Sequence, residues 1–172
     1  GGEGGGFKNP NDVASMVLLP LVRSKVDVPI IAAGGFIDGK TMAAAFSLGA
    51  EGIQMGTRMV SAAESPVHDN WKSAIVDAKE TGTVFLNKFH SPALRALRTE
   101  RTSRLERDPE TNVMSEFGSA LDLYYGGDME AAIPLSGQVA GRIESVKPVA
   151  EILAETQAEF FETVNSLAGN YL

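Results

Sequence analysis

The sequence contains no cysteine among its 172 residues. Disulfide bonds, thiolate metal ligands and cysteine nucleophiles are therefore excluded. Histidine is also scarce: His68 and His90 are the only two, and their separation matches no common zinc-binding spacing. We expect no catalytic metal, and the lack of cysteine fits a reducing cytoplasm as the location.

Long hydrophobic runs and an excess of positive charge are absent as well. The longest apolar stretch, near 28–35, is far shorter than the roughly 20 residues that a membrane-spanning helix needs. Asp and Glu total 22 against 15 Lys and Arg, whereas proteins that bind nucleic acid carry clustered basic residues. We expect neither a membrane nor a nucleic acid as partner. The 44% hydrophobic content indicates a folded globular chain.

The first third of the sequence predicts two strands, each preceded by a helix. Helices are expected over 11–24, capped at position 11 or 12, and from the cap Asp38 to a C-terminal Gly49; strands are expected over 26–33 and 52–55. The first strand is apolar throughout, as in a strand buried on both faces. A strand, a short helix and a second strand form a βαβ unit, so the two strands should be parallel and the turns that follow them should lie on one edge.

Those two turns are rich in glycine, and they are the strongest functional signal in the sequence. Gly34 and Gly35 follow the first predicted strand, and Gly56 and Thr57 follow the second. Glycine lets backbone N–H groups approach an anion closely, and a helix N-terminus adds partial positive charge. The spacing is equally compatible with glycines that serve only as tight-turn residues.

Two segments carry a specific resemblance. PIIAAGGFIDG (29–39) and LGAEGIQMGTR (48–58) look like the nitronate monooxygenase (2-nitropropane dioxygenase) family. The resemblance continues through 64–72 and 137–143, which are similar to the flavin-type enoyl-ACP reductases of the same superfamily. It therefore covers most of the chain.

The resemblance implies an α/β fold that is the C-terminal part of a TIM (β/α)8 barrel, followed by a helical extension. Residues 1–64 would supply the last βα units of an FMN-binding barrel, and 65–172 a helical cap. A complete barrel takes about 250 residues, so the barrel is incomplete in this chain and its N-terminal half is an expected partner. The helices expected after Ser65 cover 66–81, 92–107, 116–125 and 146–168.

The cofactor implied by the resemblance is FMN, with NAD(P)H as a possible electron donor. The residues that carry over as cofactor-binding are Gly5, Gly6, Gly34, Gly35, Gln54, Met55, Gly56 and Thr57.

The opening segment departs from the family at one position. Glu3-Gly4-Gly5-Gly6-Phe7 resembles the family's Glu-Ala-Gly-Gly-His, which borders the flavin, and Phe7 stands where the family has its histidine. Phenylalanine can neither accept a proton nor polarise an oxygen, so the catalytic base is unknown and base-dependent nitronate chemistry is in doubt. The alternative is a shifted alignment within a glycine-rich loop.

The sequence is compatible with three functions. The first is an FMN-dependent oxidoreductase resembling nitronate monooxygenase. The second is an NAD(P)H-dependent enoyl-thioester reductase of the same fold, with an acyl thioester rather than another small molecule as substrate. The third is a non-catalytic fragment or assembly module. A homodimer is possible in each case.

The remaining candidates have ordinary structural explanations. We expect His68 to be a solvated or helix-capping residue and His90 to be structural. Arg98, Arg101 and Arg104 would form a cationic helix face, which either pairs with neighbouring acidic residues or attracts a phosphate-bearing carrier. The glycines that flank Gln138 could let that segment approach the barrel closely.

Overall fold

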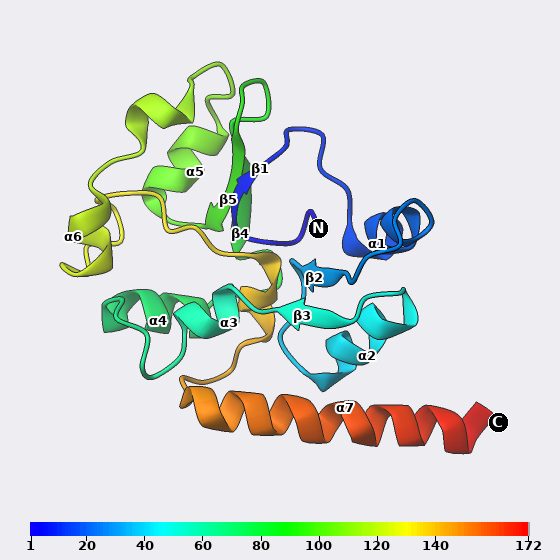
Figure 1. Ribbon diagram of the computed structural model, residues 1–172. Helices are drawn as coiled ribbons and strands as arrows, with labels where there is room; N and C mark the ends of the chain where they lie inside the picture. The colour runs from blue at the N-terminus through cyan, green and yellow to red at the C-terminus, as the bar shows by residue number, and fades with distance from the viewer. Residues whose placement is uncertain (172) are drawn as a thin grey trace.

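The computed structural model describes residues 1–171, which form two small sheets with helices around them (Figure 1). In one sheet, β2 (Ile31–Ala33) pairs with β3 (Gly52–Gln54). In the other, the strand order is β1 (Gly6–Lys8), β5 (Ala93–Leu97), β4 (Thr83–Leu86). The described chain is α/β and does not close a barrel.

The predicted βαβ unit is present. Strands β2 and β3 are parallel, with Ile31 opposite Gly52 and Ala33 opposite Gln54, and α2 (Gly39–Ser47) connects them. The expectation that the first strand is buried on both faces is wrong within the described residues: Ile31 is 59% exposed, because β3 is the only strand that pairs with β2.

Helix α2 begins and ends as its sequence predicts. The Asp38 carboxylate accepts a hydrogen bond from the Thr41 backbone N–H at 2.8 Å, and the Thr41 hydroxyl caps the Asp38 backbone in return. Gly49 ends the helix in the left-handed region, at φ 94°. Helix α7 (Val149–Tyr171) lies along α2 (Figure 1), and its Phe160 ring packs edge-on against Phe46 with 5.2 Å between the ring centroids.

The helix before β2 begins later than predicted. Helix α1 covers Ser15–Arg23 and its N-cap is Ala14, so the expected start at position 11 or 12 is wrong. The residues in front of it have tertiary partners instead. Val13 accepts a hydrogen bond from Gly2, and the Asp12 carboxylate lies 3.9 Å from the guanidinium of Arg95.

The expectation that the chain is entirely helical after Ser65 is also wrong, because β4 and β5 form an antiparallel hairpin within the region expected to be helical. Residues 93–97, expected as the first part of a helix, are β5, and only the following residues are helical. Helices α3 (Thr57–Val60), α4 (Asp69–Val76), α5 (Glu100–Glu106) and α6 (Ala120–Tyr124) and short 3-10 turns at Val113–Glu116 and Gln138–Arg142 complete this part.

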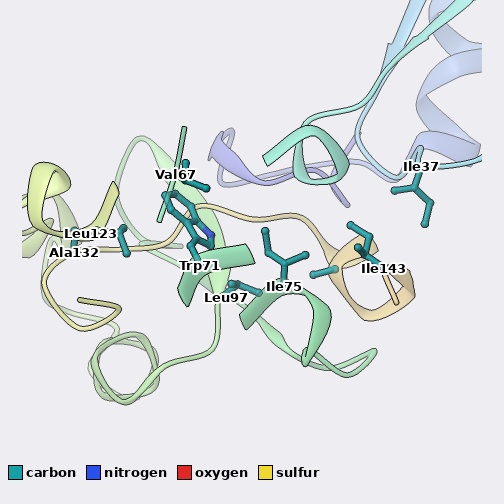
Figure 2. Packing of buried hydrophobic residues seen from close by; sticks show 9 residues of the cluster. Ile37, Val67, Trp71, Ile75, Leu97, Leu123, Ala132 and Ile143 are labelled. Atoms are coloured by element: carbon teal, nitrogen blue, oxygen red, sulfur yellow. The ribbon is translucent and has the colours of Figure 1, made fainter. Parts of the chain in front are cut away.

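A core around Trp71 holds the C-terminal part together (Figure 2). Trp71 is 1% exposed, its ring meets Tyr124 edge-on at 4.9 Å, and its indole N–H donates to the Ser136 hydroxyl at 3.3 Å. Ile75 on the same helix and Leu97 at the end of β5 belong to this cluster. The core thereby fixes the 136–138 segment relative to α4.

No helix within residues 1–171 is both long enough and apolar enough to cross a bilayer. The cytoplasmic location stays a prediction.

The cap of α2 gives a first testable expectation. Replacing Asp38 by alanine removes the side-chain acceptor at the helix start, which should lower the free energy of unfolding by about 0.5–2 kcal/mol. Urea denaturation followed by circular dichroism measures this change. Asp38 also forms an ion pair with Arg142, so Asp38→Asn is the control: asparagine keeps the cap and loses the charge. If the asparagine variant loses as much stability as the alanine variant, the ion pair rather than the cap is responsible.

Candidate functional site

The two glycine turns meet at one cavity of about 260 Å³. Both strand ends contribute to it, as expected for adjacent parallel strands. Its lining comprises Gly1, Gly4, Gly5, Lys8, Ala33, Gly34, Gly35, Phe36, Gln54, Gly56, Thr57 and Val139. Of the residues predicted to bind a cofactor, the cavity brings together all but Gly6 and Met55, which are not among its lining residues in the described chain.

The turn after β2 needs glycine for two different reasons. Gly34 and Gly35 have φ angles of 92° and 91°, a region that other residues seldom adopt. A Cβ on Gly34 would also lie 2.8 Å from the Gly1 carbonyl oxygen, whereas a Cβ on Gly35 would meet nothing closer than the Glu3 side chain at 3.5 Å. Close backbone packing therefore makes Gly34 the more demanding position.

The loop before β1 lines the cavity through Gly1, Gly4 and Gly5, and the 136–138 segment packs against this loop. The Gln138 N–H donates to the Glu3 carbonyl at 2.9 Å, and the Gly137 N–H donates to the Thr57 hydroxyl at 2.8 Å. A Cβ on Gly5 would fall 2.5 Å from the Ser136 carbonyl carbon. The expected close approach of the Gln138 segment is thus confirmed, and it connects the C-terminal part to the opening loop and to the second glycine turn.

Glu3 and Ser15 fix the position of the first turn. The Glu3 carboxylate accepts from the Ser15 backbone N–H at 2.9 Å and lies 3.0 Å from the Ser15 hydroxyl. That hydroxyl also lies 2.9 Å from the Gly34 carbonyl oxygen. The sequence does not predict this positioning role, for which its only signal is the carboxylate of Glu3 in front of the glycine run.

Backbone donors at the cavity lack partners in the protein. In the described part of the chain, the N–H groups of Gly35 and Gly56 make no hydrogen bond. Thr57 begins α3, and the first N–H groups of a helix have no acceptor within it. Residues with unpaired N–H donors therefore line the cavity together with the basic side chain of Lys8, a combination that suits an anion.

Phe7 lies on the other face of β1 from Lys8. Successive side chains of a strand point to opposite faces, and Phe7, opposite Leu94, packs its ring at a centroid distance of 6.1 Å from the ring of Phe117. Phe7 is 56% exposed and does not line the cavity. Its correspondence to the family's histidine stays a prediction.

The other candidate residues have structural partners. The His68 ring caps α4 by accepting from the Asn70 N–H at 3.1 Å, and the His90 ring lies 3.0 Å from the Glu110 carbonyl oxygen. The arginines do not form one helix face, because Arg98 precedes α5.

Acidic and carbonyl groups surround those arginines. Arg98 and Arg104 pair with Glu106 and Glu116 at 2.6 and 2.9 Å. Arg101 donates to the backbone carbonyls of Glu116 and Glu130. Pairing, the simpler of the two interpretations of this basic stretch, therefore accounts for their positions.

The structure superposes on two solved structures over nearly its whole length. FabK from Thermotoga maritima matches 99% of this chain and 55% of its own at 40% identity, with a TM-score of 0.92. Nitroalkane oxidase from Streptomyces ansochromogenes matches 90% of this chain and 46% of its own at 26% identity, with a TM-score of 0.73. The chain is thus the α/β C-terminal part of a TIM barrel with its extension.

The chain belongs to the nitronate monooxygenase family, whose model matches residues 1–159. A probable nitronate monooxygenase of Staphylococcus aureus is 33% identical over 164 residues, which are 90% of this chain and 46% of that protein. A 5-hydroxy-7a-methyl-1-oxo-octahydro-1H-indene-4-carboxyl-CoA dehydrogenase of Mycobacterium tuberculosis is 44% identical over 109 residues, 62% of this chain and 30% of that protein. The chain therefore spans less than half the length of these curated relatives.

Proposed function

We propose that this chain forms the phosphate-binding part of an FMN-dependent oxidoreductase. The observation that carries the proposal is the cavity at which two glycine turns from adjacent parallel strands meet a lysine. In TIM barrels a phosphate site recurs in the loops after the last two strands. A volume of about 260 Å³ lies below the roughly 300–1,000 Å³ of pockets that enclose a whole ligand, so it suits one end of a larger cofactor.

The residues present fit the phosphate end of FMN. The unpaired N–H groups of Gly35 and Gly56 and the ammonium of Lys8 are donors, and no carboxylate lines the cavity in residues 1–171. FMN, when bound, would supply the electron transfer. The chain would hold the phosphate, and the Glu3–Ser15 contact would keep the first turn in place.

Two reactions are candidates for the complete protein. Nitronate oxidation is the first, because the chain belongs to the nitronate monooxygenase family. Reduction of an enoyl thioester by NAD(P)H is the second, and Phe7 favours it, because hydride transfer depends on orientation more than on a general base. The relative that acts on a carboxyl-CoA supports an acyl thioester as the substrate class.

An anaerobic titration of the intact protein separates these reactions. NADH or NADPH should bleach the flavin absorbance if the protein is the reductase, and an enoyl thioester should then restore it. A nitroalkane or its nitronate should bleach the flavin instead if the protein is a nitronate monooxygenase. Bleaching by neither donor class would contradict both reactions.

Flavin content tests the remaining alternative, a non-catalytic assembly module. Purified intact protein should be yellow and should release FMN on denaturation, which mass spectrometry can identify. A colourless, compact protein that does not take up added FMN would contradict the proposed function. The N-terminal barrel half and a homodimeric partner remain proposals, for which the mass of the native particle is the measurement.

A further inference from the structure

Lys8 lines the cavity and belongs to neither glycine turn. Within the described residues it is the only ionisable side chain in the lining. This chain carries a net charge of -7. A lysine side chain in a glycine-lined cavity of an acidic chain marks a site for an anion.

The strand geometry aims Lys8 at this cavity. Lys8 is the last residue of β1, where it pairs with Ala93 of β5, and alternation along the strand separates it from Phe7. Its ammonium donates to the Gly1 carbonyl at 2.7 Å and lies close above Gly4, where an added Cβ would be 2.8 Å from Nζ. The charge is thus held at the rim formed by the opening loop.

The nearby carboxylates leave this charge without a direct partner. Those of Glu3 and Asp12 are turned to Ser15 and Arg95, and within residues 1–171 the Lys8 ammonium forms no ion pair with a carboxylate. Burial, and then the positive charge of Arg95, lower the pKa of Lys8 below its ordinary value. An anion in the cavity would offset both effects.

We propose that Lys8 binds the phosphate group of the flavin nucleotide and thereby gives this protein its preference for FMN over riboflavin. This inference rests on the proposed function. The backbone N–H groups of the two turns shape the site, and Lys8 supplies its positive charge. Riboflavin has the same ring and ribityl chain without the phosphate, so its binding does not involve Lys8.

The test compares four forms of the intact protein: wild type, Lys8→Gln, Lys8→Arg and the control Lys25→Gln. Lys25 is exposed and lies outside the cavity lining. Flavin-free protein is titrated with FMN and, separately, with riboflavin, and quenching of flavin fluorescence gives each Kd. Hydrogen bonds to charged groups correspond to an affinity change of about 10-fold to 100-fold, which is the loss expected for FMN with Lys8→Gln.

The same variant should leave the affinity for riboflavin unchanged. Lys8→Arg keeps the charge and should retain most of the FMN affinity, and Lys25→Gln should match wild type. Inorganic phosphate should displace FMN from the wild-type protein but should leave bound riboflavin in place. This competition also shows whether free phosphate occupies the same site.

Two results would overturn the assignment of Lys8 while leaving the proposed function intact. An equal loss of FMN and riboflavin binding in Lys8→Gln would mean that Lys8 only holds the opening loop through Gly1. Unchanged FMN binding in that variant would mean that the turns alone bind the phosphate. Wild-type protein that binds neither flavin would overturn the proposed function itself, and the Lys8 assignment with it.

Discussion

Replacing Gly34 by alanine should lower the affinity of the intact protein for FMN by at least about 100-fold, equivalent to losing two charge-assisted hydrogen bonds. The reason is local crowding. At a φ of 92° the new Cβ would lie 2.8 Å from the Gly1 carbonyl oxygen and 3.1 Å from the Gly4 nitrogen, both of which are backbone atoms. The turn must shift, which would move its N–H groups relative to the N–H of Gly56. Equilibrium dialysis with FMN measures the loss.

Two further glycine variants distinguish a local change in the turn from a loss of overall folding. Gly35→Ala adds the same unfavourable φ without a close contact, so its loss should be smaller. Gly169→Ala, on α7 with open space around its Cβ, should bind FMN as wild type does. Thermal unfolding of each variant shows whether the protein is still folded. If folded Gly34→Ala binds FMN normally, the turn does not contact the phosphate.

Introducing the family's histidine at Phe7 should raise nitroalkane oxidation by about 10²–10⁴-fold, the usual contribution of a general base. The substitution should be tolerated, because Phe7 is more than half exposed and its main ring contact is Phe117. Reduction of the flavin by NADH should change little, since hydride transfer needs orientation rather than a base. Steady-state assays of the intact protein with a nitroalkane, and separately with NADH, measure the two effects.

Phe89→His is the matched control. Phe89 is also an exposed aromatic residue, in the turn between β4 and β5, and a histidine there should leave nitroalkane oxidation unchanged. A gain confined to Phe7→His would support the alignment of the opening loop with the family motif. No gain would indicate that position 7 faces Phe117 rather than the reacting group. Robust oxidation by the unmodified protein would mean that another residue supplies the base.

The first third of the fold could be predicted from the sequence because its signals are local. The parallel pairing of β2 with β3 follows from the short crossover between them, and Asp38 and Gly49 fix the two ends of that crossover through their own hydrogen bond and backbone conformation. The convergence of the two glycine turns follows from the same parallel pairing. His68 caps α4 through a bond to a residue two positions away, which is equally local.

Two of the three strands of the second sheet, β5 and β1, could not be predicted in this way. Residues 93–97 (ALRAL) are good helix formers, yet they form β5 because strands on both sides pair with them and their apolar side chains enter buried clusters. Strand β1 consists of a glycine followed by two residues at the end of a glycine-rich run, where no strand pattern exists. Both strands exist only as parts of the sheet.

The sequence by itself determined the family, the βαβ unit and the glycine turns, because each depends on residues close together in the chain. The tertiary structure decided the remainder of the site. Lys8 reaches the cavity only because Gly6 pairs with Arg95 across the sheet, and the 136–138 segment reaches the opening loop and Thr57 only because the core around Trp71 holds it there. Contacts between residues about 90 or 130 positions apart depend on the packing of the whole chain, which no local pattern of residue types encodes.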